Sequence, residues 1–193
     1  VLFETLQVNE SKASYKINSS FLGAKAPYSG NVTYQLLYNG EIIREGAKEF
    51  KSVFVGINDE IRNPKLWSPE TQNVGFKWVG ISDKKEFLLN GKPYKLKGAS
   101  RHQDYKNIGN ALTDAMHVKD IELMKAMGCN FLRIAHYPQD PAIYDACDRL
   151  GLITWSEIPV VDKVVNNETF FNNSKLMMAE MIFQNYNHPS IAI

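Results

Sequence analysis

The segment LRIAHYPQDP, Leu132–Pro141, decides the fold of this chain. It reads as the end of a buried strand, yet it carries Arg133 and His136. Ionisable side chains are seldom buried without a partner, so the middle of a strand core is a costly place for them. Pro138 cannot donate to a strand ladder and ends the strand. We therefore expect Arg133 and His136 at the carboxyl end of a buried strand.

The sequence around this segment alternates between strand and helix patterns. A helical pattern over Thr113–Met127, with Val118, Ile121, Met124 and Met127 on one face, is stopped by Gly128. The elements predicted after it are a strand over Asn130–Ile134, a helix over Pro141–Leu150, a strand over Leu152–Trp155, a helix over Ser174–Tyr186 and the start of a strand over Ser190–Ile193. Short apolar strands that alternate with helices imply a parallel sheet.

Residues 1–83 show the alternation of strands and no helical period of useful length. An alternating apolar pattern over 32–38 meets Asn39-Gly40, which is a strong hairpin signal because both turn residues need positive φ. Ser52–Ile57 is another predicted strand, and a second hairpin is centred on Asn90-Gly91. We expect an antiparallel β-sandwich here, followed by the alternating half from residue 84.

Composition excludes several classes of protein. The chain has 193 residues, with 22 basic and 21 acidic side chains, so its charge makes no case for nucleic acid or an anionic membrane as partner. No apolar run is long enough to span a bilayer. Val1–Glu4 does not open a signal peptide, which leaves the location unknown, with a periplasmic or secreted full-length protein as an alternative. Cys129 and Cys147 are expected as free thiols in the core.

Polar residues gather where three predicted strands end. Arg101-His102-Gln103-Asp104 follows the first strand, Arg133 and His136 the second, and Ser156-Glu157 the third. In a (β/α)₈ barrel, active sites are built at this carboxyl-terminal face. Two blander interpretations stay open: Arg133 and Glu157 could form a structural ion pair, and a lone histidine at a strand end is often structural. Trp155 lies within a strand and is expected in the core.

Two other functions fit parts of the pattern. A metal-dependent barrel hydrolase would use His102, His136 and Glu157 as ligands, since two histidines and a carboxylate suit zinc, although no compact ligand motif is present. A non-catalytic module that binds carbohydrate or protein would use the sandwich alone, but it would not need the alternating half.

The chain resembles glycoside hydrolase family 2, which includes β-galactosidases and β-glucuronidases. The stretches that carry the resemblance are Asn90–Gly98, Arg101–Asp104, Asn130–Pro138 (NFLRIAHYP), Asp148–Glu157 and Asn187–Ile191, in order and at fitting spacings. Leu66–Glu70 (LWSPE) is a weaker match to the end of the family's immunoglobulin-like domain.

The resemblance implies a multidomain α and β protein. Residues 1–83 would form an immunoglobulin-like β-sandwich, and residues 84–193 the first half of a (β/α)₈ TIM barrel that ends within its fourth strand. It implies a retaining β-glycosidase, β-galactosidase-like in the first place, that acts on a carbohydrate substrate, with a homo-oligomer as its candidate assembly. His102, Asp104, Arg133, His136 and Glu157 would line the substrate pocket.

The chain departs from the family in three respects. The family's acid/base, a Glu preceded by Asn at the end of the fourth strand, and its nucleophile are expected beyond Ile193, so no catalytic residue is assigned within this chain. Glu157 matches a glutamate that helps bind magnesium in some members, but the residues after it differ, so no metal and no other cofactor is expected. Glu70 also runs into Val74-Gly75-Phe76 sooner than the family's sandwich would allow.

Overall fold

The computed structural model describes residues 2–8, 11–20, 29–38, 41–51, 54–64, 66–70 and 77–193. The strands are β1 Leu2–Val8, β2 Lys12–Ser20, β3 Gly30–Tyr38, β4 Glu41–Phe50, β5 Phe54–Arg62, β6 Val79–Ile81, β7 Phe87–Leu89, β8 Lys92–Pro93, β9 Gly98–Arg101, β10 Phe131–Ile134 and β11 Ile153–Ser156. The helices are α1 Asp114–Ala126, α2 Pro141–Leu150 and α3 Glu168–Asn185. The predicted turn at Asn39-Gly40 lies outside the described residues. So do residues 71–76, where the sequence passes from Glu70 to Val74-Gly75-Phe76 sooner than in the family.

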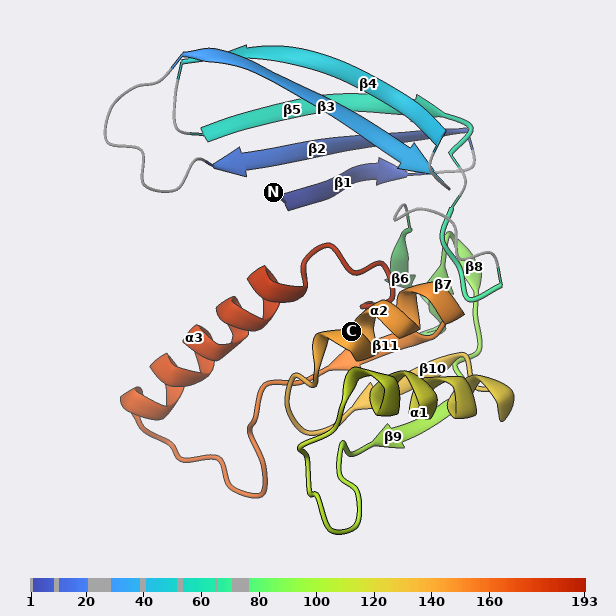
Figure 1. Cartoon of the computed structure of the whole chain (residues 1–193), viewed down its shortest axis with the longest axis vertical. Helices are drawn as coiled ribbons and strands as arrows, with labels where there is room; N and C mark the ends of the chain where they lie inside the picture. Colours follow the sequence, from blue (N-terminus) through green and yellow to red (C-terminus); the bar gives the residue numbers. More distant parts are fainter. Residues whose placement is uncertain are drawn as a thin grey trace.

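The first five strands form two antiparallel sheets, β1–β2–β5 and β3–β4. Figure 1 shows the β3–β4 pair lying over the other sheet, well apart from the helices. Asp59 of β5 joins the two sheets, because it accepts hydrogen bonds from Arg44 of β4, from Tyr34 of β3 and from Tyr15 of β2. Ala13 and Tyr15 are the fully buried centre of this region. The predicted strand character of this half is confirmed.

A small antiparallel sheet, β6–β7–β8, follows. The predicted hairpin at Asn90-Gly91 is confirmed, with φ of 52° and 82°. The Asn90 side chain accepts from the Trp78 amide and donates to the Trp67 carbonyl, which fixes the hairpin against the preceding segment. Strand β6 lies before the expected boundary at residue 83 and pairs with β7 beyond it.

The parallel sheet has the order β9–β10–β11, and both pairings are parallel as predicted. A Cβ on Gly98 would lie 1.8 Å from the Phe131 carbonyl oxygen, so β9 can begin this close to β10 only with glycine. In Figure 1, α1 and α2 lie on one face of this sheet. Leu132 and Ile134 of β10 are fully buried in the cluster that these two helices cover.

The ends of α1 and α2 follow local chemistry. The Asp140 carboxylate accepts from the Ala142 amide, Pro141 is the first helical residue, and Gly151 closes α2 with a φ of 72°. Gly128 follows α1 with a φ of 85°. Met127, expected on the buried face of α1, is 72% exposed, because the helix ends before it and its side chain points to solvent. Cys129 and Cys147 are buried free thiols, as predicted.

Helix α3 begins at Glu168, six residues before the predicted start at Ser174. Asn167 caps it by accepting from the Phe170 amide, a signal that the apolar period did not reveal. After α3, Ile191 makes a parallel bridge with Thr154 of β11, so the segment predicted as a fourth strand begins in the expected direction but is a single bridge here. Within the part of the chain that the structure describes, no helix combines the length and apolar character needed to cross a membrane.

Candidate substrate-binding site

The strand register decides which side chains can meet. Arg133 of β10 pairs with Trp155 of β11, whereas Ile134 pairs with Arg101 of β9. Successive side chains of a strand point to opposite faces. Arg133 therefore lies on the sheet face away from α1 and α2, and Arg101 lies on the helix-covered face.

Arg133 and Glu157 form a two-pronged ion pair at the ends of neighbouring strands. Nε of Arg133 is 2.5 Å from Oε1 of Glu157, and Nη2 is 3.1 Å from Oε2. The hydrogen bonds from Arg133 hold the pKa of the Glu157 carboxyl below its usual range, and Glu157 in turn raises the pKa of Arg133. Both groups therefore remain charged at neutral pH.

The two histidines complete the cluster. His136 Nδ1 lies 3.2 Å from Nη2 of Arg133 and 3.4 Å from Oε2 of Glu157, so this nitrogen can accept from the guanidinium or donate to the carboxylate, depending on the tautomer. The His102 ring meets the His136 ring edge to face, with centroids 5.3 Å apart and an interplanar angle of 66°. We call His102, Arg133, His136 and Glu157 the rim cluster.

Asp104, the fifth predicted site residue, is not joined to the rim cluster. It lies exposed beyond β9 and makes no hydrogen bond or ion pair with those four residues in the part of the chain that the structure describes. The structure thus brings together four of the five residues that the sequence singled out.

Arg101 takes a role that the sequence did not reveal. It is 6% exposed and donates to Asp120 of α1 through Nε at 3.0 Å and Nη2 at 2.6 Å. It also donates through Nη1 to Oε1 of Gln139 and through Nη2 to Nδ1 of His117. This buried network lies behind the rim cluster, between β9, α1 and the loop before α2. No spacing in the sequence links these residues.

Trp155 was expected in the core and is 41% exposed. Its ring centroid lies 6.0 Å from Cζ of Arg133. The expectation was wrong because β11 is covered by helices on one face only, and Trp155 lies on the other. An exposed tryptophan beside a charged cluster offers an apolar wall to a ligand.

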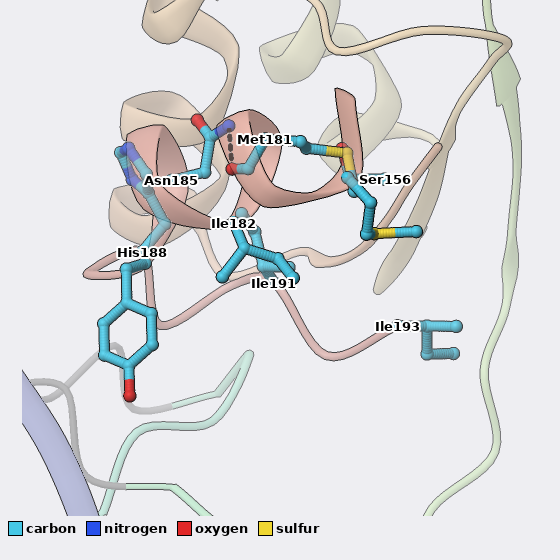
Figure 2. A pocket seen from close by; sticks show the side chains of 9 residues that line it. Ser156, Met181, Ile182, Asn185, His188, Ile191 and Ile193 are labelled. Carbon is cyan, nitrogen blue, oxygen red and sulfur yellow. Dashed lines mark hydrogen bonds between the residues drawn. The ribbon is translucent and has the colours of Figure 1, made fainter. Parts of the chain in front are cut away.

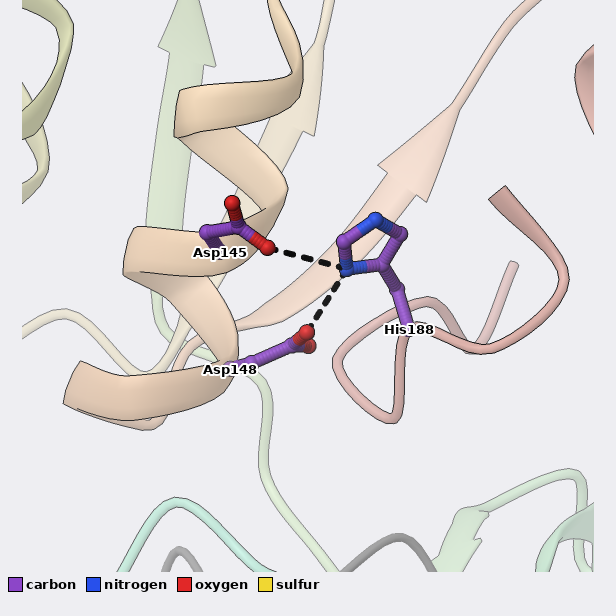
Figure 3. Close-up of side chains that lie close together, drawn as sticks. All are labelled: Asp145, Asp148 and His188. Carbon is purple, nitrogen blue, oxygen red and sulfur yellow. Dashed lines mark hydrogen bonds and ion pairs between the residues drawn. The ribbon is translucent and has the colours of Figure 1, made fainter. Parts of the chain in front are cut away.

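The metal-ligand set considered from the sequence is not formed. Both carboxylate oxygens of Glu157 are engaged by Arg133, whose positive charge opposes a cation at this point. Among the described residues, the side chains with ligand atoms near one another are Asp145, Asp148 and His188 instead (Figure 3). Asp148 accepts from the Ser190 amide at 2.8 Å and lies 2.7 Å from Nδ1 of His188. These bonds tie the turn after α3 to α2.

An apolar groove of about 330 Å³ lies between α3 and the end of β11 (Figure 2). Its lining residues are Ser156, Met178, Met181, Ile182, Asn185, Tyr186, His188, Ile191 and Ile193. In Figure 2, Ile182 projects from α3 toward Ile191, whereas the Met181 side chain reaches toward Ser156. The groove has few polar groups, so it differs in chemistry from the rim cluster.

Known proteins match this chain along its whole length. The model described as glycosyl hydrolases family 2, TIM barrel domain, matches residues 79–193. A β-glucuronidase of Bacteroides fragilis is 44% identical over 128 residues, which cover 63% of this chain and 18% of that protein. A β-galactosidase of Thermoanaerobacter pseudethanolicus is 28% identical over 215 residues, covering 99% and 29%. The structure of Bacteroides uniformis β-glucuronidase 2, covalently bound to cyclophellitol-6-carboxylate aziridine, matches with a TM-score of 0.87 and 37% identity, covering 98% of this chain and 26% of that chain.

This chain belongs to glycoside hydrolase family 2, as the resemblance predicted. Its homologues are glycoside hydrolases named β-glucuronidase or β-galactosidase. It spans between 18% and 29% of the lengths of the three proteins just described.

Proposed function

We propose that this chain is part of a retaining β-glycosidase and that His102, Asp104, Arg133, His136 and Glu157 bind its sugar. The observation that carries the proposal is the rim cluster, which gathers at the carboxyl ends of three neighbouring parallel strands in a chain of family 2. Arg133 and His136 supply donors and the carboxylates supply acceptors, which is the mixture that sugar hydroxyls require. Asp104, which lies exposed on the segment after β9, is included because the family resemblance assigns it to the sugar pocket.

The acid/base and the nucleophile are assigned to residues outside this chain. A retaining mechanism needs two carboxyl groups about 5 Å apart, one of them a proton donor with a raised pKa. Glu157 has the opposite electrostatics, because Arg133 lowers its pKa and engages both of its oxygens. Glu157 therefore suits the binding and orientation of substrate and not proton donation.

The substrate that we propose first is a β-glucuronide, and a β-galactoside is the alternative. The sequence alone favours a β-galactosidase-like activity. The 44% identity to a β-glucuronidase over 128 residues, against 28% to a β-galactosidase over 215, supports placing the glucuronide first. The carboxylate named in the ligand of the Bacteroides uniformis enzyme points the same way, since Arg133 could pair with such a group.

The test is a substrate panel for the enzyme that contains this chain: aryl β-glucuronide, galactoside, mannoside and glucoside. We expect the highest kcat/KM on the glucuronide, with retention of configuration in the product. Equal turnover of all four would remove the sugar assignment. Loss of activity in a chelator, restored by zinc, would favour the metal-dependent hydrolase instead.

We further propose the domain organisation that the family implies, an immunoglobulin-like sandwich followed by the first half of a (β/α)₈ barrel. Two antiparallel sheets and three parallel strands in chain order support it. The pairing of β6 with β7 favours a boundary near residue 78 instead of 83. The pieces 77–193 and 84–193 test this. The longer piece should unfold at higher urea concentration, and equal midpoints would favour the boundary at 83.

A further inference from the structure

We propose that Gln139 is a positioning residue: its side-chain amide ties together the backbone carbonyls that precede the two histidines of the rim cluster, His102 and His136. Gln139 is 6% exposed and lies directly before Asp140, the N-cap of α2. It touches neither histidine side chain in any described contact, so its effect would pass through the backbone.

The tie consists of two hydrogen bonds from one nitrogen. Nε2 of Gln139 donates to the Arg101 carbonyl at 2.8 Å and to the Ala135 carbonyl at 3.1 Å. A side-chain amide nitrogen has two N–H groups, so both bonds form at once. Arg101 is 6% exposed and Ala135 is fully buried, so water cannot readily replace this donor. Breaking these hydrogen bonds would leave buried carbonyls without a donor, which is unfavourable. The two bonds should therefore persist in the folded chain.

The amide is held in one orientation. Its Oε1 accepts from Nη1 of Arg101 at 2.7 Å, and a flipped amide would turn N–H groups toward a guanidinium that can only donate. Arg101 is itself held by Asp120 and by His117. The network behind the sheet thus fixes the direction in which Gln139 presents its two donors.

The tie acts where the strand ladder stops. The last residue pair of the parallel ladder between β9 and β10 is Arg101 with Ile134. Beyond that pair, Gln139 joins the residue before His102 to the residue before His136. The relative placement of the two rings, 5.3 Å apart, follows from where these two carbonyls are held. The placement of the two rings is independent of the proposed function, whereas any consequence for sugar binding rests on it.

Gln139→Glu separates the tie from the packing. The variant keeps the size of the side chain and an acceptor for Arg101, but a carboxylate has no N–H to donate to the two carbonyls. Gln139→Met also removes the contact with Arg101. Ile143→Val is the matched control, because it trims a buried side chain of α2 and leaves the amide in place.

The measurement is the NMR spectrum of the imidazole rings in the 193-residue chain, which has four histidines, with Leu176→Lys and Phe183→Glu present in every sample so that the exposed side chains of α3 do not drive self-association. We expect loss of the ring-to-ring nuclear Overhauser effect between His102 and His136 in Gln139→Glu, and shifted signals for both. The His188 signals should not move, which reports an intact fold, and Ile143→Val should keep the ring contact. An unchanged ring contact in Gln139→Glu with the His188 signals in place would overturn the proposal. If Gln139→Met unfolds, Gln139→Glu still decides.

Activity gives a separate reading. In the enzyme that contains this chain, Gln139→Glu should raise KM for the best aryl β-glycoside at least several-fold, more than it lowers kcat. If the ring contact is lost and KM stays unchanged, the positioning role stands, and the sugar-binding role proposed for the histidines fails. The two hypotheses therefore fail on different measurements.

Discussion

Arg133 and Glu157 form a bidentate ion pair, with Nε of Arg133 2.5 Å from one carboxylate oxygen and Nη2 3.1 Å from the other. The sequence left open whether this pair is structural or binds substrate, and the geometry is compatible with both roles. Nη1 of Arg133 makes no hydrogen bond within the described residues, so it is a donor that a sugar carboxylate or hydroxyl can use. The bidentate pair with Glu157 then fixes the direction of that donor.

Replacing Arg133 separates the two roles. In the enzyme that contains this chain, Arg133→Ala should lower kcat/KM by about ten-fold or more, roughly 1.4 kcal/mol of transition-state stabilisation. The measurement is steady-state kinetics on the best aryl β-glycoside. Arg149→Ala is the control, since Arg149 is an exposed arginine on α2 and lies outside the rim cluster. Unaltered turnover in a well-folded Arg133→Ala enzyme would mean that the pair is structural only.

Asp59 should carry much of the stability of the N-terminal sheets. It accepts from Arg44 twice, at 2.7 Å each, and from Tyr15 and Tyr34. Asp59→Ala removes the group that joins the two sheets and should lower the free energy of unfolding by roughly 1–3 kcal/mol. Urea unfolding followed by tyrosine near-UV circular dichroism measures this. Glu60→Ala breaks an exposed pair with Lys12, which solvent screens, and should therefore lower the free energy of unfolding far less than Asp59→Ala does. Equal losses in both variants would contradict the role of Asp59.

The sequence predicts the parts of this molecule whose rules are local. The glycine after α1, the helix over Pro141–Leu150 and the parallel strands all follow from periodicity and turn chemistry. The candidate site could be predicted in part, since the carboxyl ends of parallel strands meet at one edge. What escaped prediction depends on long-range contacts. The contact of Arg101 with Gln139 spans 38 positions along the chain, and nothing in the local sequence distinguishes that glutamine from a loop residue.

Lys77 should make the folded chain more stable as pH rises, and Lys77→Met should remove this effect. Its amine donates to the carbonyls of Pro189 and Ile191, and burial lowers its pKa to about 7, with Asp148 partly opposing this. An unfolded lysine titrates near about 10.4. Between these values the unfolded chain binds more protons than the folded chain, so stability increases as pH rises. The neutral amine can still donate to both carbonyls.

Urea midpoints at pH 7 and pH 9 test this effect of Lys77. The wild-type chain should gain on the order of 1–2 kcal/mol over that range relative to Lys77→Met. Lys84→Met, at an exposed turn, should show the wild-type slope. A Lys77→Met chain whose stability rises with pH as steeply as the wild type would rule out a lowered pKa at this lysine.

His188 should contribute the opposite pH dependence. Its hydrogen bond to Asp148 raises the pKa of the imidazole above its usual value. The folded state therefore favours the protonated ring, and this stabilisation is fully present below about pH 6.5 and lost as pH rises through the folded-state pKa. The stability difference between wild type and His188→Gln should shrink between pH 5.5 and pH 8.5. His102→Gln, at an exposed ring, is the control. A difference that does not change with pH would contradict the pairing.

The exposed apolar side chains of α3 should make the 193-residue chain self-associate. Phe171 is 59% exposed, Leu176 59% and Phe183 67%, and none of the residues of α3 is buried. Exposed apolar side chains on a helix that also lines the groove of Figure 2 are a surface that further barrel units would cover in the proposed enzyme. Expressed alone, the chain should bind a hydrophobic dye and sediment as more than a monomer. Phe183→Glu with Leu176→Lys should reduce both effects, and a monomer that binds no dye would contradict the proposed half-barrel.

The same 193-residue chain should hydrolyse no aryl β-glycoside, because its two carboxylates near the candidate site do not suit the two catalytic roles. Glu157 is held ionised by Arg133, and Asp104 lies exposed outside the rim cluster. Without a protonated carboxyl at the glycosidic oxygen and a second carboxylate at the anomeric carbon, a retaining mechanism has neither its acid nor its nucleophile. The assay compares this chain with the enzyme that contains it on aryl β-glucuronide and galactoside. Turnover by the short chain, abolished by Asp104→Asn or Glu157→Gln, would make that carboxylate catalytic and overturn the roles proposed here.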